Sequence, residues 1–116
     1  MKTPTRRMRD TRRVYAFELH LAGPNQPIRR LRALARRIWS AESKRRDRCP
    51  TIVAGRGTPL KTKLSSYCYG RSRIVLARNQ RDRVTLIHEM VHALGCETHG
   101  DRFQRRYAEL LGKYYR

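Results

Sequence analysis

The sequence has few acidic residues, few cysteines and no long apolar run. Its 116 residues include 9 Asp and Glu against 28 Lys and Arg, which gives a formal net charge of +19. The three cysteines, at positions 49, 68 and 96, form no CxxC pair, which argues against a zinc ribbon or a disulfide scaffold and fits a reducing compartment. No apolar stretch approaches the roughly 18–20 residues of a membrane span, and no apolar segment follows the basic N-terminus as in a secretory signal. We therefore expect a cytoplasmic protein, not secreted, without a membrane partner.

The chain nevertheless carries enough apolar side chains for one folded domain. A hydrophobic content of 39% is too high for a simple disordered polycation, and 116 residues correspond to one domain. Residues 1–13 hold six basic side chains against one acidic one and almost nothing to bury. They predict a disordered basic arm, followed by a single domain over residues 14–116.

Residue patterning predicts an α+β domain. Asn79 is a candidate N-cap, with Asp82 in a capping-box-like position, and Gly95 is a candidate for the residue that ends the same helix. The expected elements in chain order are a strand at 14–21, with a short helix as the alternative, a helix at 28–44, a strand at 51–54, a strand or extended loop at 60–69, a strand at 73–77, a helix at 80–94 and a helix at 101–115.

One segment of the predicted helix at 80–94 carries reactive side chains. It reads His88-Glu89-Met90-Val91-His92, an H-E-x-x-H pattern. Two histidines at i and i+4 lie on one face of a helix and can reach one zinc ion. Glu89 points about 100° further round, where it can take a proton from water as a general base. Apolar residues cover most of this helix otherwise, so the polar side chains need partners. The plain alternative is a core helix with two hydrogen-bonded histidines.

A catalytic zinc ion needs a third protein ligand and an open position. His99 is the leading candidate, because Gly95 can end the helix and let the following turn return to the metal. Cys96 lies at i+4 from His92 and could reach the same face if the helix continued. Glu109 on the last helix is also conceivable, because zinc accepts all three ligand types.

The motif and the residues after it resemble the SprT-like zinc metallopeptidases. That family shows H-E-x-x-H-A, a spacer, then H-G-x-x-F on the next helix, and here His88 to Ala93 are followed by His99-Gly100-Asp101-Arg102-Phe103. The spacer is short for many members. In the metzincin pattern, the third histidine would fall on Thr98, so the SprT-like comparison fits better.

The resemblance implies a fold, a cofactor and an activity. The fold would be a small zincin-like domain with a packing helix, a short, mostly antiparallel sheet, the motif helix and a C-terminal helix. One catalytic zinc ion would bind His88, His92 and His99, and Glu89 would be the general base. The substrates would be proteins, including proteins bound or crosslinked to DNA.

Arginines crowd one side of the predicted helix at 28–44 and its end. Guanidinium groups bind phosphate in a bidentate manner, so this side predicts sequence-independent, salt-sensitive binding of nucleic acid, with DNA favoured over RNA. The protein would then be nucleoid- or nucleic-acid-associated within the cytoplasm. The candidate contacts are Arg29, Arg30, Arg32, Arg36, Arg37, Lys44, Arg45 and Arg46.

Two other functions fit the same features. A three-histidine metal site on a basic domain is also found in YbeY-type endoribonucleases, which lack the glutamate after the first histidine. A non-catalytic nucleic-acid-binding protein with a structural zinc ion is the other alternative. Glu89 favours the peptidase over the endoribonuclease.

Overall fold

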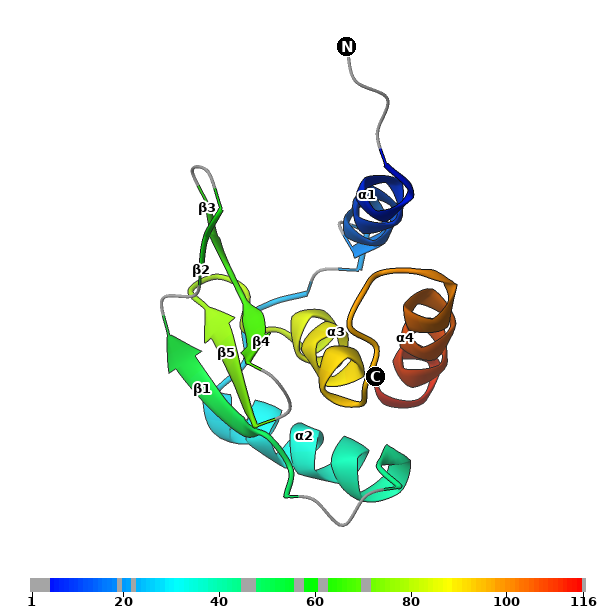
Figure 1. The fold of residues 1–116 in the computed structure, drawn as a ribbon. Helices are drawn as coiled ribbons and strands as arrows, with labels where there is room; N and C mark the ends of the chain where they lie inside the picture. The colour runs from blue at the N-terminus through cyan, green and yellow to red at the C-terminus, as the bar shows by residue number, and fades with distance from the viewer. Residues whose placement is uncertain are drawn as a thin grey trace.

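Four helices and five strands make up the part of the chain that the computed structural model describes, which is residues 5–18, 20–21, 23–44, 48–55, 58–60, 63–69 and 72–115. Figure 1 shows their arrangement. The helices are α1 (Arg6–Glu18), α2 (Ile28–Glu42), α3 (Arg83–Ala93) and α4 (Asp101–Tyr114). The strands are β1 (Thr51–Gly55), β2 (Thr58–Leu60), β3 (Lys63–Ser65), β4 (Tyr67–Tyr69) and β5 (Arg73–Ala77). The predicted α+β class is confirmed.

The main sheet has three strands in the order β1-β5-β4. β1 and β5 run parallel, β4 and β5 run antiparallel, and β2 and β3 form a separate antiparallel pair. The expectation of a mostly antiparallel sheet is therefore wrong for the longest strand pair. Strand β5 is central, and its residues 74–77 are all buried, which explains its continuous apolar run, as in a strand covered on both faces.

Helix α3 is the centre of the layered arrangement. It contacts β4 and β5 on one side and α4 on the other, while α2 packs against β1 and α3 (Figure 1). Helix α3 is apolar nearly all round, as expected of a helix enclosed in this way. Its side chains of Leu86, Ile87 and Met90 are fully buried. The motif is therefore carried on the most enclosed helix among the described elements.

The ends of α3 differ in part from those expected. The N-cap is Asp82, whose Oδ1 accepts a hydrogen bond from the backbone N–H of Thr85 at 2.8 Å. Asn79, the predicted cap, instead adopts a left-handed conformation with φ 68° in the turn after β5. The predicted C-terminal glycine is confirmed, because Gly95 has φ 115° directly after the last helical turn.

Helix α1 replaces two expected features. Residues 6–13 were expected to be disordered and residues 14–21 to form a strand, with a short helix as the alternative. Arg6 to Glu18 instead form one continuous helix. Val14 is its single buried residue. Residues 1–4 lie outside the described part of the chain. Among the described helices, none is both long and apolar enough to span a bilayer.

Candidate metal centre

Three histidines converge at one end of α3. His88 and His92 come from α3, and His99 comes from the loop between α3 and α4. Their Nε2 atoms are separated by 3.2 Å (His88 to His92), 3.2 Å (His92 to His99) and 3.1 Å (His88 to His99). Three nitrogens about 2.0–2.1 Å from a tetrahedral zinc ion would lie roughly 3.3 Å apart. The three histidines therefore have the spacing of a metal site, and they form the one such group found among the described residues.

The turn after α3 brings His99 to the other two histidines. The backbone N–H of Gly95 donates to the His92 carbonyl, and the N–H of Cys96 donates to the Val91 carbonyl at 3.3 Å. This pair of bonds is the Schellman motif, which needs a residue with positive φ and therefore favours glycine at position 95. The chain reverses there, and the side-chain amide of Gln104 donates to the His99 carbonyl at 2.9 Å.

Phe103 forms an apolar support for the three imidazoles. Its ring centroid lies 4.9 Å from that of His88, 4.8 Å from that of His92 and 4.9 Å from that of His99. The side chain is fully buried at the start of α4. Contact with all three rings at once restricts their rotation and keeps water away from this side of the cluster.

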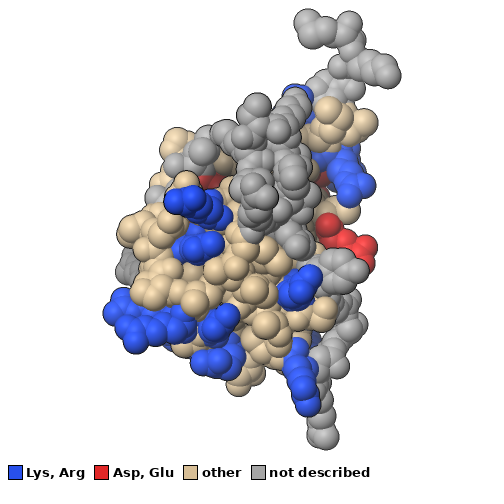
Figure 2. Space-filling model, turned by 90° about the vertical axis from the view of Figure 1, so that its left-hand side faces the viewer, with Lys and Arg blue, Asp and Glu red and all other residues tan. Residues whose placement is uncertain are grey.

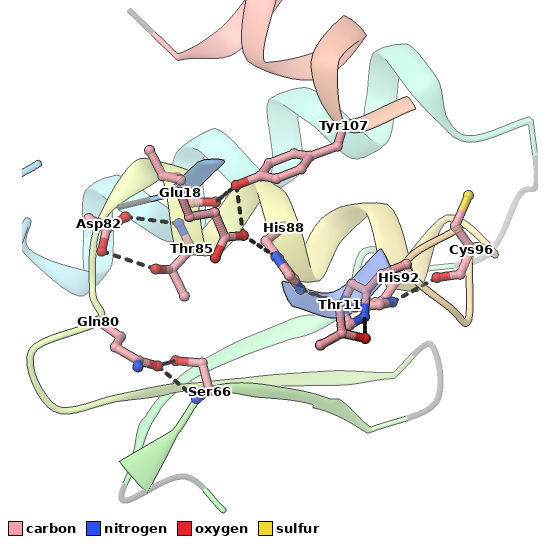
Figure 3. A network of polar contacts seen from close by, with 12 residues as sticks. Thr11, Glu18, Ser66, Gln80, Asp82, Thr85, His88, His92, Cys96 and Tyr107 are labelled. Carbon is pink, nitrogen blue, oxygen red and sulfur yellow. Dashed lines mark hydrogen bonds and ion pairs between the residues drawn. The ribbon is translucent and has the colours of Figure 1, made fainter. Parts of the chain in front are cut away.

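Each histidine also has a partner at its outer nitrogen, Nδ1. His88 Nδ1 contacts the Glu18 carboxylate, and His92 Nδ1 lies 2.7 Å from the Cys96 carbonyl oxygen (Figure 3). His99 Nδ1 lies 3.1 Å from Thr11 Oγ1. The Thr11 hydroxyl donates its own proton to the Arg7 carbonyl, so it accepts from His99.

All three partners accept hydrogen bonds, so they place the imidazole protons on Nδ1 and the lone pairs on Nε2. The three lone pairs then point at one another across about 3 Å. Neutral imidazoles arranged in this way can ligate a cation, and outer partners of this kind are typical of metal-binding histidines. The donor set therefore fits zinc.

The electrostatics keep two of the three histidines neutral. Burial and the neighbouring charge of His88 lower the pKa of His92 and of His99 to about 4. For His88, burial alone would lower the pKa, but the hydrogen bond to Glu18 and the charges of Glu89 and Glu18 raise it overall. A metal ligand must be unprotonated, so His92 and His99 are in the required state at neutral pH.

Glu89 lies beside this cluster on α3 and is 6% exposed. Burial and the Glu18 charge raise the pKa of its carboxyl group to about 7, against the lowering effect of His88. Within the described part of the chain, its carboxylate has no hydrogen-bond partner. The thiol of Cys68 on β4 is close enough that burial and the charge of Glu89 raise its pKa to about 12, which keeps it protonated.

The other two candidate ligands are not part of the cluster. Cys96 contributes its backbone carbonyl to His92, and its sulfur is not among the grouped donor atoms. Glu109 is 46% exposed on α4, where it pairs with Arg106 and Lys113. Of the three alternatives, the structure therefore brings His99 to the motif histidines.

The predicted nucleic-acid contacts are spread over α2. All five predicted arginines of α2 are exposed. Two of them also have partners: Arg32 donates through Nε to the Ile52 carbonyl at 2.9 Å, and Arg37 lies over the Tyr114 ring at 5.5 Å. Lys44 is exposed beyond the helix. The predicted contacts at positions 45 and 46 lie outside the described residues.

The sequence analysis missed the contribution of α1 and of Tyr107 to the site. Glu18 and Thr11 hold His88 and His99, and the Tyr107 hydroxyl donates to Glu18 Oε1 at 2.9 Å (Figure 3). One signal was available: residues 11, 14, 15 and 18 have the i, i+3, i+4, i+7 spacing of a helix face. Because Thr11 and Glu18 on this face are polar, a search for apolar periodicity does not detect the helix.

No protein-family model, curated protein or solved structure matches this chain. The resemblance to the SprT-like peptidases therefore depends on the motif residues between His88 and Phe103. The chemistry of these residues, and not a relative, is therefore the basis for assigning a function.

Proposed function

We propose that this chain is a zinc-dependent peptidase of the SprT-like type. His88, His92 and His99 would hold one zinc ion, and Glu89 would be the general base. The observation that carries the proposal is the convergence of three Nε2 atoms within 3.2 Å of one another, while each Nδ1 atom has an oxygen partner. Three protein ligands with a free fourth position are typical of catalytic zinc, whereas structural sites use four.

The residues around the three histidines suit peptide hydrolysis. A zinc ion held by the three histidines would act as a Lewis acid on the scissile carbonyl and would lower the pKa of water. Glu89 follows His88 directly, so its carboxylate lies beside the cluster and not within it. From there it takes the proton from the attacking water and delivers it to the nitrogen of the leaving amine. Its burial keeps bulk water from competing for the same proton transfer.

The exposed arginines support association with nucleic acid. Arg29, Arg30 and Arg36 have no partner in the described residues that would neutralise them, and α2 contains one acidic residue, at its last position. Figure 2 shows basic side chains at several separate places on the face of the molecule that lies to the left in Figure 1, with little acidic surface between them. Separate phosphate contacts of this kind fit sequence-independent binding of DNA.

Removing three of these charges should weaken DNA binding and reduce its dependence on salt. Each phosphate contact contributes about 0.9 to the slope of log K against log salt concentration. Replacing Arg29, Arg30 and Arg36 by alanine together should therefore lower the slope by up to about 3. Fluorescence anisotropy with a labelled duplex at several salt concentrations measures it.

A charge-matched control uses arginines elsewhere on the surface. Arg78, Arg102 and Arg105 are also exposed, and their replacement by alanine removes the same total charge. If the slope of log K against log salt concentration falls equally in both triple variants, α2 is not the DNA-binding surface.

A substrate panel separates the peptidase from the two alternatives. The zinc-loaded protein should cleave an unfolded protein. It should cleave a DNA-bound protein faster than the same protein without DNA. It should leave labelled RNA and DNA intact. Gel electrophoresis of both components of each mixture measures the products. Cleavage of RNA but not of protein would identify the endoribonuclease instead, and zinc binding without any cleavage would identify a structural site.

A further inference from the structure

Helix α1 supplies two of the three outer hydrogen-bond partners of the candidate metal ligands. His92 is held locally, by the Cys96 carbonyl four positions further along the chain. His88 and His99 are held from 70 and 88 residues away, by Glu18 and Thr11. Two of the three imidazoles thus depend on α1 for their orientation.

Glu18 is itself fixed in place. Its side chain is 19% exposed, and its Oε1 accepts the hydrogen bond from the Tyr107 hydroxyl. Tyr107 is 2% exposed in the core. A carboxylate held in this way and bonded to Nδ1 fixes the tautomer of His88 and increases the electron density at its Nε2. Tyr15, one turn before, stacks on His88 with an interplanar angle of 3° and also contacts His99.

Among the described residues, α1 has few other attachments to the domain. Val14 is its single buried residue, while Met8, Tyr15 and Phe17 are 48%, 42% and 49% exposed. The ion pair of Arg6 with Asp101 joins two side chains that are more than 70% exposed, and pairs of this kind add little stability. A helix of 13 residues is marginal by itself in water. Contacts with the histidines are therefore a large part of what holds α1 in place.

We propose that Glu18 and Thr11 are positioning residues of the metal centre, and that metal binding and the docking of α1 are thermodynamically coupled. This inference rests on the proposed function, because it takes the three histidines as metal ligands. A bound metal would fix the Nε2 side of the His88 and His99 rings, which sets the direction of their Nδ1 atoms toward α1. Docked α1 in turn fixes the rings for the metal, and such coupling acts equally in both directions.

Two measurements on Glu18→Gln test the positioning role. Glutamine keeps the size of the side chain and removes its charge. Loss of an outer partner typically lowers metal affinity 10–100-fold, so a loss in that range is expected when zinc affinity is measured by competition with a chromophoric chelator. The matched control is Glu97→Gln, which makes the same change at an exposed carboxylate two residues before His99 and should leave the affinity unchanged.

Hydrogen exchange tests the coupling independently of any activity. In the wild type, zinc should slow exchange of the α1 amides much more than exchange of the α2 amides, which serve as an internal control. In Glu18→Gln at saturating zinc, the extra protection of α1 should be lost while α2 remains protected. A variant that is merely less stable would instead change both helices.

The possible outcomes distinguish this inference from the proposed function on which it rests. Wild-type zinc affinity in Glu18→Gln, or α1 exchange that does not respond to zinc, would overturn the coupling and leave the proposed peptidase intact. A wild-type chain that binds no zinc would overturn the proposed function and the coupling with it.

Discussion

Replacing Glu89 by glutamine is expected to abolish peptide hydrolysis while leaving zinc bound. Glutamine has the shape of glutamate but no basic carboxylate, and the three histidines are untouched. General base catalysis contributes typically 10²–10⁴-fold to a rate, so kcat should fall by about that factor. Initial rates on an unfolded protein substrate, measured alongside the zinc content of the same preparation, give both quantities.

The matched control for this variant is again Glu97→Gln. Glu97 is an exposed carboxylate in the turn after α3, so its loss should change neither the rate nor the zinc content. Retention of most of the activity in Glu89→Gln would rule out Glu89 as the general base. Loss of zinc from Glu89→Gln would show that the carboxylate supports the metal and not the proton transfer.

Replacing His99 by alanine is expected to remove tight zinc binding. Two ligands at i and i+4 remain. Removing a direct ligand should lower zinc affinity by more than the 10–100-fold that is typical of removing an outer hydrogen-bond partner. Zinc at about 100 times its dissociation constant stabilises a fold by about 2.7 kcal/mol, or roughly 10–20 °C in Tm for a domain of this size. The wild type should show this increase on addition of zinc, and His99→Ala should show almost none at the same concentration.

The fourth histidine provides the control for this measurement. His20 lies exposed in the turn after α1, outside the cluster of His88, His92 and His99. His20→Ala should bind one zinc ion per chain and show the wild-type increase in Tm. A full thermal response in His99→Ala would mean that His99 is not a ligand, despite its 3.1 Å approach to His88.

The site was predictable from sequence where its geometry follows from local chain structure. His88 and His92 lie one turn apart on a single helix, and Gly95 at the predicted C-terminus indicates the reversal that returns His99. Both features depend on a few consecutive residues. The choice of His99 over Cys96 and Glu109 needed the structure, because each of the three could reach zinc through a different local path.

Helix α1 was not predictable from apolar periodicity. The face that docks carries Thr11 and Glu18 as well as Val14, since part of it binds imidazoles and not an apolar core. Tyr15 and Phe17 remain 42% and 49% exposed. Their alternation with smaller and polar residues has the period of a strand over residues 14–21, which is why a strand was predicted there. The alternating residues do not form a buried face.

The parallel pairing of β1 with β5 was equally beyond local inference. Three short strands, β2, β3 and β4, separate the two in sequence. The direction in which β5 returns depends on the course of that whole connection. Strand composition indicates that β5 is buried on both sides, but it does not indicate the orientation of its neighbours.

The contact between Glu18 and His88 also bears on the order in which the chain folds. It joins residues 70 positions apart, whereas α3, its turn and the start of α4 are consecutive. Contacts between distant positions form at a greater entropic cost of closing the intervening loop. Helix α1 precedes its partners on α3 and α4 in the chain, so it is synthesised before them. We therefore expect the docking of α1 to be a late step that follows the formation of α3, its turn and the start of α4.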